Sequence, residues 1–190
     1  MKRLALVLLA GCPGCVDTSD PPWQLDHDRI VAVHTEPAGV GTGEVATITG
    51  LLAHRDGPAT EESPIIVTAL EPHELFTAVH YDVDHWQIDG PALAEPTPLT
   101  IEMRFAAGEV ATKIIWLGEH RENPAATADV PDPFPLHHDV DLGPGEWFSS
   151  CGTLAGTVLR VDDACTGQVA WVVRDADDGV SWAVRNLRTP

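Results

Sequence analysis

The feature that most constrains the fold of this chain is a regular alternation of apolar and polar residues in short segments. In LTIEMRF (99–105), four apolar side chains fall on one side of an extended backbone, and the threonine, glutamate and arginine fall on the other. A two-residue period predicts a strand with one buried face. The segment VATKIIWLG (110–118) follows a turn at 106–109 and is predicted to be its hairpin partner.

Six further segments have a similar character, and hydrophobic residues make up 44% of the 190 residues, which is enough for a core. These segments are short, rich in β-branched residues and bounded by turn-forming residues. They cover residues 29–35, 44–53, 64–70, 146–154, 168–175 and 180–187. No stretch shows the period of a long helix. Many short strands separated by turns predict an all-β sandwich.

A proline-rich segment divides the chain. HRENPAATADVPDPFP (120–135) holds four prolines and breaks the alternation, which indicates a linker or a long inter-strand loop. We therefore expect two small sandwiches, at 26–122 and 123–190. The second would be small for an independent domain, so a single sandwich over 26–190 with an insertion is the alternative.

The first twelve residues, MKRLALVLLAGC, have the pattern of an export signal. Lys2 and Arg3 precede an apolar run that is too short to cross a bilayer. The run ends in LAGC (9–12), which resembles the lipobox of bacterial lipoproteins. That resemblance implies a lipoprotein signal peptide at 1–11, a lipid anchor on Cys12 and a tether at 12–25. An ordinary cleaved signal peptide is the alternative.

The resemblance also places the protein in the cell envelope. Residue 13 is proline rather than the aspartate that retains enteric lipoproteins in the inner membrane, which favours the outer membrane. In an exported protein, Cys151 and Cys165 are expected to form a disulfide, and the short loop it closes would contribute about 3 kcal/mol. Cys15 is left over, either free or paired with another molecule.

Two longer segments resemble known β-domains. RIVAVHTEPAGVGTGEVATITGLL (29–52) is similar to the opening of bacterial Ig-like domains, with a proline-containing turn between two strands. GQVAWVVRDADDGVSWAVRNL (167–187) is similar to the closing strands of Ig-like or PKD-like domains. Together they resemble uncharacterised cell-envelope lipoproteins of the myxobacterial type. The resemblance implies Ig-like β-sandwiches and brings no catalytic or ligand-binding residues.

The charge of the chain excludes some partners. There are 29 acidic and 11 basic residues, for a formal charge of -18. A surface this negative repels nucleic acid and anionic lipid headgroups, whereas cations and basic partners are attracted.

Two pentapeptides and one turn carry side chains that bind metals. HYDVD (80–84) and HHDVD (137–141) would each place a histidine and two aspartates on one strand face, as zinc or calcium sites require. DADDG (175–179) matches a calcium loop in part, although a hairpin turn is the favoured interpretation. An exposed strand face with Val83 and Val140 pointing inward explains both pentapeptides without a metal. The candidate ligands are His80, Asp82, Asp84, His85, His137, Asp139, Asp141, Asp175 and Asp177.

The sequence contains no nucleophile elbow, zinc-protease motif or phosphate-binding loop. Four of the six tryptophans lie in alternating strands and are predicted to be core residues, whereas Trp23 and Trp86 are candidates for stacking on a sugar. We expect a lipid-anchored, non-enzymatic binding or architectural module without a cofactor. Its partner would be an envelope protein or a polysaccharide. A calcium- or zinc-binding envelope protein is the alternative, and a metal-dependent hydrolase is a more distant one.

Overall fold

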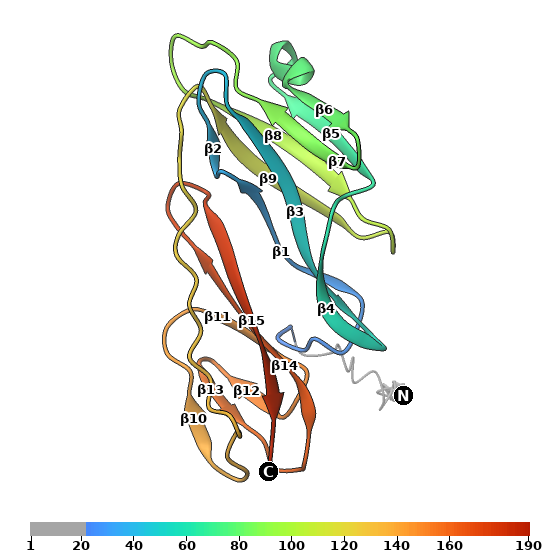
Figure 1. The fold of residues 1–190 in the computed structure, drawn as a ribbon, viewed down its shortest axis with the longest axis vertical. Coiled ribbons are helices and arrows are strands. Elements are labelled where there is room, and N and C mark those ends of the chain that lie inside the picture. Colours follow the sequence, from blue (N-terminus) through green and yellow to red (C-terminus); the bar gives the residue numbers. More distant parts are fainter. Residues whose placement is uncertain (1–21) are drawn as a thin grey trace, which may run out of the picture.

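The computed structural model describes residues 22–190, which are nearly all β (Figure 1). Each of the eight segments predicted to be strands contains at least one, so the prediction of an all-β sandwich is confirmed. The predicted signal peptide, Cys12, Cys15 and residues 12–21 of the predicted tether lie outside the described residues. Within 22–190 the one helix is a 3-10 turn of six residues, η1 (His73–Ala78), and no helix there is long and apolar enough to cross a membrane.

The first half of the molecule is a sandwich of two sheets. The first sheet has the order β1-β3-β7-β6, and β4 pairs with the far end of β3. The second sheet has the order β2-β9-β8-β5, with β2 and β9 parallel. The strands are β1 (Arg29–Glu36), β2 (Gly39–Val40), β3 (Val45–His54), β4 (Gly57–Glu62), β5 (Ile66–Glu71), β6 (Val79–Asp82), β7 (His85–Asp89), β8 (Thr97–Arg104) and β9 (Val110–Leu117). This order, A-B-E-D facing G-F-C, is that of an immunoglobulin-like sandwich.

The second half also consists of two sheets, but each has three strands. The third sheet has the order β11-β14-β15 and the fourth has the order β10-β13-β12. The strands are β10 (Asp139–Asp141), β11 (Glu146–Ser149), β12 (Thr153–Ala155), β13 (Val158–Arg160), β14 (Thr166–Arg174) and β15 (Val180–Arg188). This order does not repeat that of the first half. The segment 146–154, expected to be one strand, forms β11 and β12, because a turn at 150–152 separates them.

Three apolar clusters connect the four sheets. The first cluster lies between the first and second sheets and includes Ile48 and Phe105. The second joins the first sheet to the third, through Leu51 of β3 and Ala170 of β14. The third cluster lies between the third and fourth sheets. Because neighbouring residues of β3 and of β14 belong to different clusters, the first and third sheets are each buried on both faces where the two halves meet.

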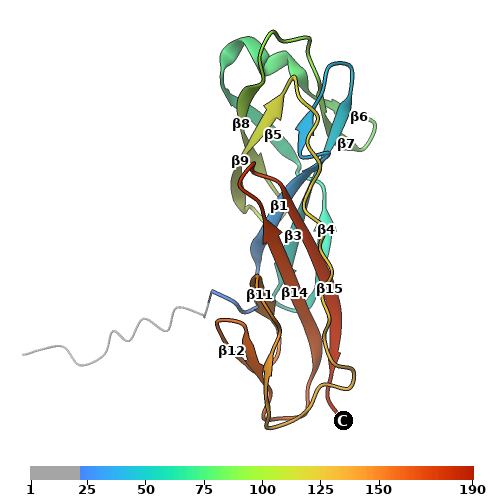
Figure 2. The same ribbon diagram turned by 90° about the vertical axis from the view of Figure 1, so that its left-hand side faces the viewer.

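The proline-rich segment 120–135 is part of the fold. Its chain runs beside β15 along the length of the second half, as both views show (Figure 1, Figure 2). The N–H of Val180, at the start of β15, donates to Asn123 Oδ1, and the N–H of Phe134 donates to the carbonyl of Arg188 at its end. Phe134 is fully buried in the third cluster. The segment is therefore a covering strap as well as a connection.

The last residues of the predicted tether also belong to the second half. The N–H of Ser149 donates to the Trp23 carbonyl, and the N–H of Leu25 donates to the Ser149 carbonyl. Leu25 is buried in the second cluster, and Trp23 packs against the third. Residues 23–25 thus extend the third sheet beside β11, in a parallel pairing at Gln24.

Candidate functional site

The turn between β14 and β15 is shaped by its own aspartates. One oxygen of Asp175, Oδ1, accepts the backbone N–H groups of Asp177 and Gly179 at 2.9 and 2.8 Å, and the N–H of Asp175 donates to the Gly179 carbonyl. Asp178 has a φ of 65°, a left-handed conformation that aspartate tolerates better than most residues. The favoured interpretation of DADDG as a hairpin turn is therefore confirmed.

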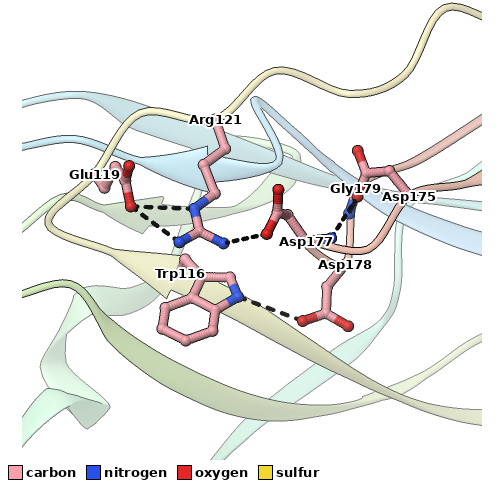
Figure 3. Close-up of polar contacts among 7 residues, drawn as sticks. All are labelled: Trp116, Glu119, Arg121, Asp175, Asp177, Asp178 and Gly179. Atoms are coloured by element: carbon pink, nitrogen blue, oxygen red, sulfur yellow. Dashed lines mark hydrogen bonds and ion pairs between the residues drawn. The ribbon is translucent and has the colours of Figure 1, made fainter.

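This turn reaches across the molecule to β9 of the first half (Figure 3). The amine of Lys113 donates to the Asp178 carbonyl at 2.6 Å, and the indole N–H of Trp116 donates to the Asp178 carboxylate at 3.3 Å. The guanidinium of Arg121 lies 4.3 Å from the centre of the Trp116 ring, an arrangement that favours a cation–π interaction. Arg121 also pairs with Asp177 at 3.6 Å and with Glu119 at 2.9 Å.

Lys113 is the most unusual group of this contact. It is only 8% exposed, and burial lowers its pKa to about 8, with the positive charge of Arg174 acting in the same direction. The charges of Asp178 and Asp175 oppose this shift without cancelling it. A buried lysine in a strand is costly unless it has a partner, and the Asp178 carbonyl provides one.

A groove of about 470 Å³ opens beside Lys113. Residues 30–33 of β1 and 111–114 of β9 form two of its walls, and the β14–β15 turn closes one end. The groove combines apolar walls with one buried amine, while the nearby carboxylates of Asp175 and Asp178 already accept protein hydrogen bonds. Its polar groups therefore serve mainly to hold the turn in place.

A second set of contacts joins the halves near the end of β1. The Asn123 amide donates to the Thr35 carbonyl and to the Glu36 carboxylate at 2.7 and 2.8 Å, and its oxygen accepts the Val180 N–H at 2.9 Å. One side chain of the strap thereby links β1 to β15. We call the contacts made by Lys113, Trp116, Arg121, Asn123 and the 175–179 turn the junction clasp.

A stacked pair of rings, one from each half, also joins the two halves. His34 of β1 stacks on Trp182 of β15 with 4.1 Å between the ring centres, and Trp182 donates its N–H to Glu61 of β4. Burial lowers the pKa of His34, so the neutral imidazole is favoured in this stack. Trp116 and Trp182, predicted to be core residues, are half-buried and connect the two halves instead.

The first pentapeptide is not one strand. β6 ends at Asp82, Val83 and Asp84 form the hairpin turn, and β7 starts at His85. Asp84 therefore does not continue the face of His80 and Asp82. Val83, expected to point inward, is 77% exposed because the turn directs it into solvent.

The histidines of this hairpin contact other partners. His80 lies 3.6 Å from the Asp89 carboxylate, and His85 lies 2.7 Å from the Gln87 amide nitrogen. The hairpin pairs Asp82 with His85 as cross-strand neighbours. These contacts do not bring the predicted ligands into one group.

In the second pentapeptide, only residues 139–141 form a strand, β10. His137 precedes it with a φ of 60° and faces Asp162 at 3.4 Å. Asp139 pairs with Arg160 at 3.4 Å. Asp141 accepts the Gly143 N–H and the Thr157 hydroxyl, and these bonds lower its pKa. Val140 is half-buried against the third cluster, as expected.

Across residues 22–190, no three histidine, cysteine, aspartate or glutamate side chains come together as a metal site would require. The predicted ligands at 175 and 177 instead accept hydrogen bonds or pair with Arg121, as described above. Metal binding at the nine predicted residues remains a prediction, and the structure offers no preformed donor set for it.

One exposed contact has the spacing of a nucleophile and its base. His54 Nε2 lies 2.9 Å from the Thr60 hydroxyl, and its Nδ1 lies 4.0 Å from Asp28. The hydroxyl donates to Glu62, and the histidine faces the same carboxylate at 3.0 Å. At 4.0 Å Asp28 is too far to orient the ring by a hydrogen bond, so this is a surface network rather than a catalytic triad.

The predicted disulfide between Cys151 and Cys165 is present and closes a loop with a sequence separation of 14. The junction clasp was not predicted. Its one visible signal is Lys113, which occupies an inward position of an alternating strand, between Ala111 and Ile115. In comparisons with known proteins, no family model, no curated protein and no solved structure matched the chain.

Proposed function

We propose that this chain is a lipid-anchored protein of the cell envelope that acts as a non-enzymatic, rigid binding arm. The anchor is Cys12, the location is the outer membrane, and no cofactor is required. The anchor rests on the resemblance of residues 9–12 to a lipobox, and the observation that supports the rigid arm is the junction. An apolar cluster and the junction clasp join two sandwiches that would otherwise be separate modules on a strap.

A stiff connection matters because small domains on a flexible linker move independently. Here the third sheet is buried on both faces, so hinge motion would expose Leu51, Ala170 and their neighbours to water. The result is an elongated body in which η1 and the C-terminus lie at opposite ends (Figure 1). A fixed separation between two ends is what an architectural module requires.

The anchor is tested by metabolic labelling with an alkyne fatty acid in a Gram-negative host. We expect the wild-type chain and the Cys15→Ser variant to carry the label and to sediment with washed membranes. The Cys12→Ser variant should carry none. An unlabelled wild-type chain, or label that survives in Cys12→Ser, would contradict the anchor.

The rigid arm is tested by small-angle X-ray scattering on the soluble Cys12→Ser chain. We expect the curve to fit a single elongated conformation. Replacing Arg121 and Asn123 together by alanine removes two parts of the junction clasp and should broaden the distribution of distances. A wild-type curve that already requires several hinge angles would exclude the rigid arm while leaving the anchor intact.

A further inference from the structure

An aromatic groove lies in the second half, where the described chain begins. It has a volume of about 450 Å³. Trp23 forms part of its wall, and Trp147 and Phe148, which are 5% and 4% exposed, lie beneath it. Leu154 and two glycines, Gly145 and Gly156, complete most of the lining. Grooves of this size and composition are typical of small-ligand sites.

The groove is held in shape before any ligand arrives. The backbone of Trp23 pairs with Ser149 of β11. The indole N–H of Trp147 donates to the Gly143 carbonyl at 2.9 Å, and that of Trp171, stacked on Trp147, donates to the Pro144 carbonyl at 3.1 Å. Because Trp147 and Phe148 are almost fully buried, the half-buried Trp23 supplies the aromatic face for a ligand, and a preformed face loses little conformational freedom on binding.

The polar groups of the groove indicate the chemistry of its ligand. Glu146 Oε2 accepts from Arg174, whereas its Oε1 has no hydrogen-bond partner within residues 22–190. The indole N–H of Trp23 likewise has no acceptor among those residues. Neither atom is buried, so a ligand that presents hydroxyl groups at its edges and C–H groups on its faces can replace the water at both and stack on the Trp23 ring. Glu146 is the one charged residue of the lining, so an anionic ligand would be repelled.

The position of the groove in the chain would keep it close to the membrane, as binding to a polymer near the membrane requires. Ten residues, 12–21, separate the predicted lipid site from Pro22 in the groove wall, and a chain of ten residues spans at most about 35 Å. The groove would therefore stay within that reach of the bilayer surface.

We infer that the groove of Trp23, Trp147 and Glu146 binds an uncharged, β-linked glycan, with one pyranose ring stacked on Trp23. β-Linked pyranoses with equatorial substituents form flat ribbons, and such a ribbon can lie in an open, rigid groove. This inference rests on the proposed binding function and names its ligand class.

The test uses the purified full chain in a detergent without a sugar headgroup. Chitohexaose and cellohexaose are the β-linked probes, maltohexaose is the α-linked control, and palmitate tests an acyl-chain occupant. Calorimetry gives the affinity, and the indole N–H resonances, assigned by tryptophan-to-phenylalanine substitution, give the position. We expect at least one β-linked probe to bind and to shift the Trp23 resonance.

The variants separate stacking from general damage. Trp23→Ala should weaken binding by about tenfold or more, whereas Trp23→Tyr should retain most of it. Tyr81→Ala is the matched control, because Tyr81 is an aromatic residue that is 57% exposed on the other half. Glu146→Gln keeps the shape and tests the carboxylate.

Three results would overturn the inference: no binding of either β-linked probe, equal binding by Trp23→Ala, or binding of palmitate alone. None of them affects the fatty-acid labelling of Cys12, so the anchor can stand if the glycan site fails. Conversely, an unlabelled chain that binds chitohexaose would retain the glycan site and lose the anchor.

Discussion

The two halves of this molecule reach stability by different means. In the first half, four of the nine strands have eight residues or more, and both sheets supply a core of aliphatic and aromatic residues. In the second half, four of the six strands have only three or four residues. That half contains the disulfide, a stacked pair of indoles and the strap. Because its short strands bury little apolar surface, the second half depends for its stability on cross-links and on packing against the first half.

The largest loss of stability is expected when the side chain that holds the strap in the third cluster is removed. Phe134 is fully buried although it lies in a proline-rich segment. Phe134→Ala should lower the free energy of unfolding by about 3–5 kcal/mol, because it leaves a cavity in the third cluster. Urea denaturation measures this loss. Phe76→Ala, at a half-buried phenylalanine of η1, is the control and should cost less than half as much. A loss below about 0.5 kcal/mol would mean that the strap is only a linker.

The next largest effect is expected from the disulfide. Replacing Cys151 and Cys165 by serine should lower the free energy of unfolding by about 3 kcal/mol, since the bond closes a loop with a separation of 14 residues. Hydrogen exchange read separately at β8–β9 and at β14–β15 locates the loss. Loss confined to β14–β15 would favour two domains at 26–122 and 123–190. Equal loss in both halves would favour one unit over 26–190.

The same contrast explains which strands could be predicted from the sequence. β8 and β9 alternate because one face of each meets the first apolar cluster at every second residue, whereas β14 and β15 were predictable from their length and their β-branched composition. β4 has the sequence GPATEE and no buried residue, so no pattern marks it. It is a strand because β3 is long enough to extend past the first sheet and offer it a partner.

The site was predicted less well than the fold, for a related reason. In HYDVD, the alternation predicts a strand, but Val83 and Asp84 form a turn. The junction clasp depends on bringing β9, residues 121–123 and the 175–179 turn together. These segments are far apart in the sequence, and their meeting is set by sheet register and packing that a single sequence does not contain.

The burial of Lys113 at the junction is tested by measuring the free energy of unfolding as a function of pH. Folding lowers the pKa of Lys113 to about 8, while an unfolded lysine titrates near 10.4, so the unfolded chain binds more protons between these values. The free energy of unfolding should therefore rise with pH across that window, by about 2 kcal/mol from pH 7.5 to 10. Lys113→Met lacks this titration. The free energy of unfolding of the wild type, relative to that of Lys113→Met, should therefore rise with pH. A constant difference would show that Lys113 is exposed and the junction open.

The smallest expected effect lies in the β6–β7 hairpin of the first half. Val83 has a φ of 49°, a left-handed conformation that a β-branched residue adopts only with strain, and 77% of it is exposed. Asparagine tolerates that conformation, so Val83→Asn should raise the free energy of unfolding by about 1 kcal/mol. Thermal denaturation followed by circular dichroism measures the gain, and Val110→Asn, at a residue 48% exposed in β9, is the control and should give none. A gain at Val83 would show that the first half tolerates local strain in one of its hairpins. A loss would mean that Val83 makes a stabilising contact, and that strain there is not what limits the hairpin.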